Sequence, residues 1–111
     1  MSSCHPNRNM EMRQAINRFS ALATPSRLEA LKLLAQHEDG LASGELARRL
    51  EVPANTISTL LFLLSQADLV RSRRENRNVV YTANVDAVRE LIDFLDEECA
   101  GGRCRRKGRK T

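Results

Sequence analysis

Two short helical patterns on either side of a tight turn constrain this chain more than any other feature of its sequence. Apolar residues recur every three or four positions in residues 44–50 and again in residues 54–67, and only Glu51, Val52 and Pro53 separate the two segments. Ser43 precedes the first segment and is a good N-cap for it. Two helices joined by so short a turn form a helix-turn-helix.

The hydrophobic period changes directly after this motif. Residues 69–73 and 79–83 are strand-like, and the polar residues 75–78 between them indicate a hairpin turn. We therefore expect a two-stranded β-hairpin, which forms a wing when it lies beside a helix-turn-helix.

Three further helices complete the predicted fold. Helical patterns of apolar residues cover residues 10–22, 26–37 and 85–99, and Asn84 can cap the last of them. With 111 residues, 41% of them hydrophobic, the chain can build one modest core and no second domain. The prediction is a mainly α winged helix-turn-helix with a β-hairpin wing, in the order ααααββα. It covers residues 10–100, between a flexible arm at residues 1–9 and a basic flexible tail at residues 101–111.

Basic and short polar side chains gather on the two segments that a winged helix presents to DNA. The formal net charge is +4, and four arginines crowd the hairpin. Guanidinium groups suit phosphate contacts or the minor groove, and short polar side chains at the start of a recognition helix can bond to base edges. A solvated hairpin and a simple helix cap are the alternatives. The residues expected to contact DNA are Ser43, Asn55, Thr56, Ser58, Thr59, Arg71, Arg73, Arg74 and Arg77.

The sequence resembles the ArsR/SmtB family of metal-responsive repressors over about residues 12–100. The segments that carry the resemblance are ALATPSRLEALKLL (residues 21–34), GELARRLEVPANTISTLLFLLSQADLV (residues 44–70) and RSRRENRNVVYTA (residues 71–83). The chain departs from the family at Leu60, where members often carry a His, and at Asp68, where they often carry a Gly.

The resemblance implies a homodimer, because in that family the first and last helices make the dimer interface. Two recognition helices would then read the two half-sites of a palindromic operator in double-stranded DNA. The residues expected in the interface are Met12, Ile16, Phe19, Leu91, Ile92 and Leu95.

Three cysteines in a chain without an apolar signal segment indicate free thiols rather than a disulfide scaffold. The longest apolar stretch, residues 57–64, is too short to cross a bilayer. We therefore expect a protein of the reducing cytoplasm, without a membrane partner, whose thiols remain available for metal or redox chemistry.

Cys99 and Cys104 lie five residues apart across a Gly-Gly pair, so the chain between them can fold back and bring both thiolates to one soft ion. Arsenite and antimonite typically take three thiolates, and Cys4 is the candidate third ligand, from the same chain or its partner. Some members of the resembled family place a Cys pair, a Gly-Gly and a later Cys after the last helix, whereas this chain has Ala100 in place of the second Cys. We expect As(III) or Sb(III) as the inducer ligand, and no cofactor in the DNA-bound form.

Other functions remain open at this point. The basic residues around Cys104 should lower its thiol pKa, which would equally suit a repressor that responds to an oxidant or a persulfide. A winged-helix protein-interaction module without DNA binding could use Phe62 and the neighbouring leucines as its contact surface. An enzyme is not expected, because the sequence shows no Gly-rich phosphate loop, no nucleophile beside a His and no metal triad.

Overall fold

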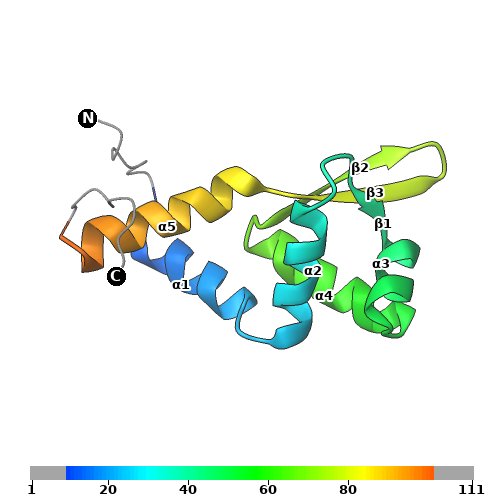
Figure 1. Cartoon of the computed structure of the whole chain (residues 1–111), viewed down its shortest axis with the longest axis horizontal. Helices are drawn as coiled ribbons and strands as arrows, with labels where there is room; N and C mark the ends of the chain where they lie inside the picture. The colour runs from blue at the N-terminus through cyan, green and yellow to red at the C-terminus, as the bar shows by residue number, and fades with distance from the viewer. Residues whose placement is uncertain (1–9, 102–111) are drawn as a thin grey trace.

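Five helices and three strands make up residues 10–101, the part of the chain that the computed structural model describes. The elements are α1 (Met12–Ala21), α2 (Pro25–Ala35), β1 (Leu41–Ala42), α3 (Ser43–Leu50), α4 (Ala54–Gln66), β2 (Val70–Glu75), β3 (Asn78–Ala83) and α5 (Val85–Cys99). Along the 45 Å long axis, α1 and the C-terminal end of α5 lie at one end and the β2–β3 hairpin lies at the other (Figure 1). The predicted winged helix-turn-helix is confirmed, with β1 as an additional strand.

The hydrophobic core lies between α4 and the neighbouring helices α2 and α3. The apolar residues at helical spacing in α4 are all buried, as the sequence predicts: Ile57, Leu60, Leu61 and Leu64. They form one cluster with Leu34 of α2 and Leu46 of α3. Burial of each such leucine is worth about 1.5–3 kcal/mol, so this cluster anchors the winged region. Every helix within residues 10–101 falls short of the length and hydrophobicity that crossing a membrane requires.

The sheet has three antiparallel strands in the order β1-β3-β2. The two residues of β1, Leu41 and Ala42, pair with Tyr81 and Val80. Gly40 directly precedes this strand with a φ of +89°, and a Cβ at that position would lie 2.6 Å from the carbonyl oxygen of Tyr81. Glycine is therefore required for the close approach to β3.

The prediction that helix α2 extends to residue 37 was wrong, since it ends at Ala35.

The hairpin turn is tighter than predicted. Strands β2 and β3 pair from Val70 opposite Ala83 to Glu75 opposite Asn78, so the turn is two residues long instead of the predicted four. Asn76, the first turn residue, has a φ of +59°. Asparagine tolerates this left-handed conformation, which two-residue hairpin turns favour because it matches the twist of the strands.

The helix caps confirm one prediction and correct another. The side chain of Asn84 accepts a hydrogen bond from the backbone N–H of Ala87 at 3.4 Å, so Asn84 caps α5 as predicted. Ser43 is not an N-cap, because it is already the first residue of α3 and Ala42 occupies the cap position without a side-chain bond. The chain enters α3 directly from β1, and this extended entry places Ala42 where the cap would be.

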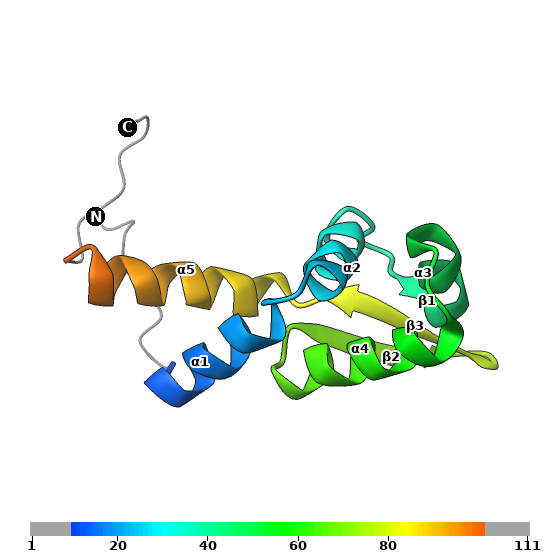
Figure 2. The ribbon, with the colours of Figure 1, turned by 90° about the horizontal axis from the view of Figure 1, so that it is seen from below.

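Helices α1 and α5 run side by side (Figure 2), and a buried arginine joins them. Arg18 is 6% exposed, and its Nη1 donates hydrogen bonds to the carbonyl oxygen of Ala87 at 3.1 Å and to Oε1 of Glu90 at 2.9 Å. Arg27 of α2 donates from Nε to the carbonyl oxygen of Ala21 at 2.6 Å, which satisfies the C-terminal end of α1. Polar contacts therefore fix α1 against both neighbours.

Candidate DNA-binding surface

The first two turns of α4 present short polar side chains to solvent. Asn55, Thr56, Ser58 and Thr59 are all exposed, because the buried residues of α4 occupy the opposite face. Pro53 is the N-cap and provides no side-chain cap, so the first backbone N–H groups of α4 remain open to an anion such as phosphate. Thr59 Oγ1 donates to the carbonyl oxygen of Asn55 at 3.2 Å. The other three side chains make no hydrogen bond within residues 10–101.

Of the four arginines of the hairpin, one makes hydrogen bonds to other described residues and three do not. Arg73 donates from Nε to Oε2 of Glu75 at 2.9 Å and from Nη2 to the carbonyl oxygen of Asp39 at 2.9 Å, so it ties the hairpin to the segment before β1. Arg71, Arg74 and Arg77 are exposed and make no ion pair or hydrogen bond within residues 10–101. These three guanidinium groups can therefore bind an external anion without first breaking an internal contact.

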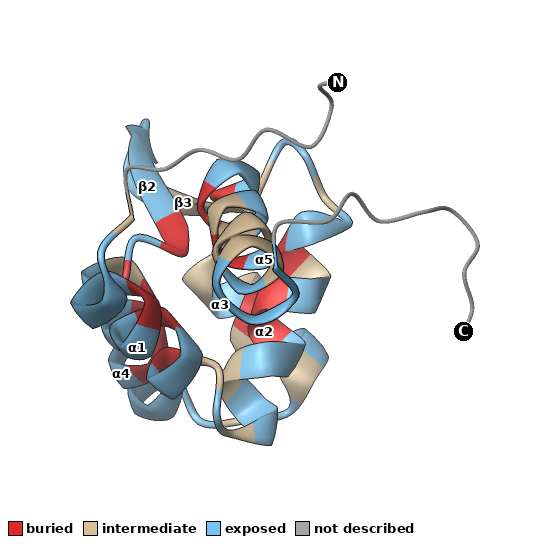
Figure 3. Ribbon diagram, turned by 90° about the vertical axis from the view of Figure 1, so that its left-hand side faces the viewer, coloured by how far each residue is buried: buried red, intermediate tan, exposed pale blue. Residues whose placement is uncertain are grey.

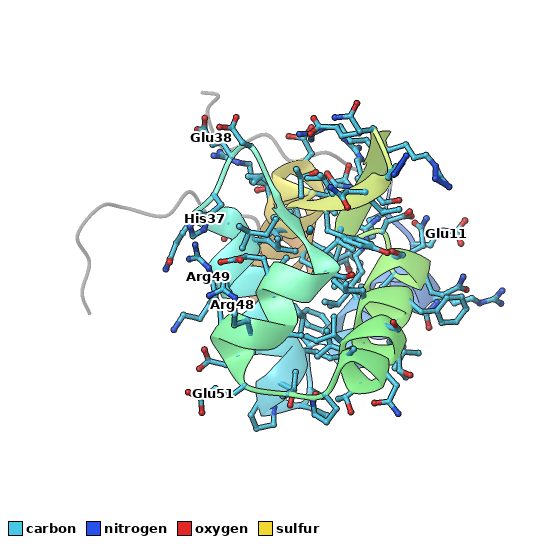
Figure 4. The ribbon with its side chains drawn as sticks, turned by 90° about the vertical axis from the view of Figure 1, so that its right-hand side faces the viewer. Glu11, His37, Glu38, Arg48, Arg49 and Glu51 are labelled. Carbon is cyan, nitrogen blue, oxygen red and sulfur yellow. The ribbon has the colours of Figure 1, made fainter. Side chains whose placement is uncertain are left out.

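The basic residues of α3 are already paired and lie on another side of the molecule. Arg49 donates to Oε2 of Glu45 at 2.6 Å, and Arg48 also pairs with this carboxylate. The hydrogen bonds from Arg49 and Arg48 lower the pKa of Glu45, which keeps it charged. Figure 4 shows His37, Arg48 and Arg49 on the side opposite to α4 and the hairpin. Ser43, the remaining predicted DNA contact, is half-buried at the start of α3.

Together, α4 and the hairpin offer the chemistry that duplex DNA requires. The 13 residues of α4 include no charged side chain that would repel phosphate, and its polar end can reach base edges in a major groove. The three unpaired arginines lie on the hairpin that follows α4, Arg71 and Arg74 on β2 and Arg77 in the turn, and can bind the adjoining backbone. Helix α4 and the hairpin lie on the same side of the molecule (Figure 4), and the bond to Asp39 gives Arg73 a supporting position.

A second surface, on α1 and α5, is apolar. Ile16 of α1 is 57% exposed and Ile92 of α5 is 54% exposed, and Met12, Phe19 and Leu95 are exposed as well. Figure 3 shows that α5 is mostly half-buried or exposed in the single chain. These five residues, Met12, Ile16, Phe19, Ile92 and Leu95, are named the α1–α5 face below.

The sixth predicted interface residue lies elsewhere. Leu91 is only 4% exposed, so it packs inside the protomer and is not part of the exposed α1–α5 face. Its inward position follows from the phase of α5, in which Ala87 and Leu91 share the buried side. Sequence reasoning also missed Arg18, whose one signal is its position three residues after Ala15 on the inner side of α1.

The described part of the predicted thiol site is a single residue. Cys99 is the last residue of α5 and is exposed as a free thiol. Cys4 and Cys104 lie outside the described residues. No group of three His, Cys, Asp or Glu side chains within residues 10–101 is placed to hold a metal ion. Cys99 is therefore the one predicted thiolate ligand among the described residues.

Comparison with known proteins gives related sequences along most of the chain. A model of the IclR helix-turn-helix domain matches residues 28–74, which run from α2 to the first wing strand. The chain is 34% identical over 82 residues to the transcriptional activator HlyU of Vibrio cholerae, and the match covers 74% of each protein. It is 40% identical over 83 residues to a transcriptional repressor SmtB homologue of Synechocystis sp.. That match covers 71% of this chain and 61% of the length of the relative.

Solved structures agree with these relatives. An ArsR-like transcriptional regulator from Rhodococcus sp. superimposes with a TM-score of 0.74 at 26% identity, covering 80% of this chain and 82% of that one. A homodimeric winged helix-turn-helix DNA-binding domain from Mycobacterium bovis gives a TM-score of 0.66 at 26% identity, covering 86% of this chain and 90% of that one. From its sequence relatives and its fold, the chain belongs to the ArsR/SmtB family of winged-helix transcriptional regulators.

Proposed function

We propose that this chain is a cytoplasmic repressor that occupies operator DNA as a homodimer and leaves it when As(III) or Sb(III) binds its cysteine thiolates. The observation that carries the DNA-binding part is the set of three unpaired arginines, Arg71, Arg74 and Arg77, on the hairpin that follows α4. Phosphate contacts of this kind supply much of the affinity of DNA-binding proteins, and the polar start of α4 supplies the base contacts.

The α1–α5 face supports the homodimer. Its exposed isoleucines and Phe19 would stay in water in a single chain, whereas a second copy of the same face can bury them. The related domain from Mycobacterium bovis is homodimeric. Pairing two chains through this face would duplicate α4 and the hairpin, and so produce two half-sites related by two-fold symmetry.

The sensing part rests on the position of Cys99. A single residue, Asn84, separates the wing strand β3 from helix α5, and α5 ends at Cys99. The same helix carries Ile92 and Leu95 of the α1–α5 face and accepts the hydrogen bond from Arg18 of α1. Drawing Cys99 towards Cys104 and Cys4 would therefore act on a helix that belongs to the interface and adjoins the wing. Ligand binding that favours another helix arrangement would weaken DNA binding, and by linkage bound DNA would weaken ligand binding by the same factor.

Fluorescence anisotropy on DNA upstream of the gene tests this proposal. Reduced protein should bind the labelled duplex and be released by stoichiometric arsenite. A Cys99→Ser, Cys104→Ser double variant should bind DNA equally well and remain bound when arsenite is added. Cys4→Ser is the matched comparison, which should weaken the arsenite response if Cys4 supplies the third thiolate.

Each other outcome would contradict part of this proposal and favour a different function. Release by peroxide and not by arsenite would assign the same thiols to redox switching, for which the exposure of Cys99 is the supporting observation. Release of the double variant by arsenite would contradict the thiol site. Failure to bind any tested duplex would favour a protein-interaction module.

A further inference from the structure

An exposed aromatic side chain continues the polar surface of α4. Phe62 is 60% exposed, although Leu61 and Leu64, one position before it and two after it, are deeply buried. At 100° per residue, Asn55, Thr59 and Phe62 fall within 60° of one another on the outer side of the helix. Phe62 is therefore the third residue of the surface that presents Asn55 and Thr59 to solvent.

The geometry points to a contact between Phe62 and the 5-methyl group of a thymine in the major groove of the bound DNA. This inference rests on the proposed function and assigns a further specificity-determining residue to it. The thymine methyl is the apolar group that the base pairs present in the major groove, and phenylalanine is among the side chains that contact it.

The spacing along α4 agrees with this contact. Phe62 lies seven positions after Asn55, which corresponds to about 10 Å of helix at 1.5 Å per residue. That length equals the rise of about three base pairs of B-DNA. If α4 lies along the groove with Asn55 on one base edge, Phe62 faces a base about three steps away.

The surroundings of Phe62 favour DNA over a second protein as its partner. Helix α4 carries no acidic side chain, and the hairpin that follows it bears the unpaired Arg71, Arg74 and Arg77. A protein docked on Phe62 would also cover Asn55 and Thr59, which share its side of the helix. The α1–α5 face already offers an apolar surface on other helices to a second copy of the chain.

Removal of single methyl groups from the DNA tests the contact. The duplex is one that the wild-type protein selects from a random pool, and each thymine in turn is replaced by deoxyuridine, which lacks only the 5-methyl group. At one position per half-site, wild-type affinity should fall about fourfold for each methyl removed, the equivalent of one buried methyl group. Phe62→Ala should bind thymine and deoxyuridine duplexes equally at that position, and Phe62→Leu should retain part of the preference.

Leu28→Ala is the matched control, because Leu28 is an exposed apolar residue of α2 outside this surface. It should keep the wild-type ratio of thymine to deoxyuridine affinity. If the ratio of thymine to deoxyuridine affinity is the same for wild type and Phe62→Ala at every position, the contact is overturned while the proposed function stays intact. An unchanged ratio with a weakened dimer, measured by sedimentation, would also overturn it and assign Phe62 to a subunit contact. Failure of the wild type to select any duplex would overturn the proposed function and this contact together.

Discussion

The winged region, which comprises α2–α4 and the sheet, differs from the α1–α5 helix pair in where its apolar residues lie. In the winged region the large residues point inward, and Leu46, Ile57 and Leu64 are fully buried. In the helix pair the inward residues of α1 are two alanines and Arg18, whereas Ile16 and Ile92 face outward. The winged region therefore buries its large apolar residues within one chain, while the helix pair leaves Ile16 and Ile92 exposed, where the proposed dimer would cover them.

Polar contacts hold the helix pair where a large apolar core is missing. Arg18 joins α1 to the carbonyl oxygen of Ala87 and to Glu90 of α5, and Arg27 binds the end of α1 at Ala21. Directional bonds of this kind fix the relative placement of helices without covering their outer faces. The comparison implies that a mutation in the core and one on the α1–α5 face should affect different measurements.

The largest effect is expected from a cavity in the winged region. Leu64→Ala removes a fully buried side chain of α4 and should lower the free energy of unfolding by about 2–5 kcal/mol, as large-to-small core substitutions do. Urea denaturation followed by circular dichroism measures this loss. A loss well below that range would mean that the winged region is not the main source of stability, and the comparison would break.

A charge on the α1–α5 face should affect assembly before folding. Ile92→Asp places a carboxylate in the proposed interface, where burial without a partner is costly, and should weaken the dimer about a hundredfold or more. Sedimentation velocity across a range of concentrations measures the shift towards monomer. Leu28→Asp places the same charge on an exposed position of α2 and should leave the dimer unchanged. Equal behaviour of the two variants would contradict the proposed interface.

The smallest effect distinguishes the two groups of arginines. Arg74→Ala removes an unpaired guanidinium group from the hairpin, and in a dimer it should reduce the salt slope of DNA binding by about two units, one for each protomer. Arg48→Ala removes an arginine that pairs with Glu45 on the opposite side of the molecule, and should leave the slope unchanged. Titration of DNA binding at several salt concentrations measures both slopes. Equal salt slopes for Arg74→Ala and Arg48→Ala would contradict the distinction between unpaired and paired arginines.

The sequence predicted those elements whose periodicity is local and strong. Helix α4 shows its buried residues through regular spacing, and Asn84 signals the start of α5 because its side chain can cap the helix. The two-residue strand β1 is too short for a periodic pattern, and its pairing with β3 depends on contacts between distant segments, of Leu41 with Tyr81 and of Ala42 with Val80. Such pairing becomes visible only in the folded chain.

The candidate site was predictable by residue type but not by partner. The composition of the hairpin indicates four equivalent arginines, yet only the fold brings Arg73 to the carbonyl oxygen of Asp39 and takes it away from the other three. Asp68 shows the reverse case. Its φ of +63° explains in physical terms why family members often carry a Gly before the first wing strand, because glycine adopts that conformation freely.

The number of chains on one bound duplex tests the central claim, that a second copy completes the α1–α5 face and DNA completes the face of α4 and the hairpin. Sedimentation equilibrium of the reduced protein with a single selected duplex measures that number. The account predicts two chains per duplex for the wild type, and loss of this complex for Ile92→Asp at concentrations where the wild type is fully bound. One wild-type chain per duplex, or an Ile92→Asp complex as stable as that of the wild type, would contradict it.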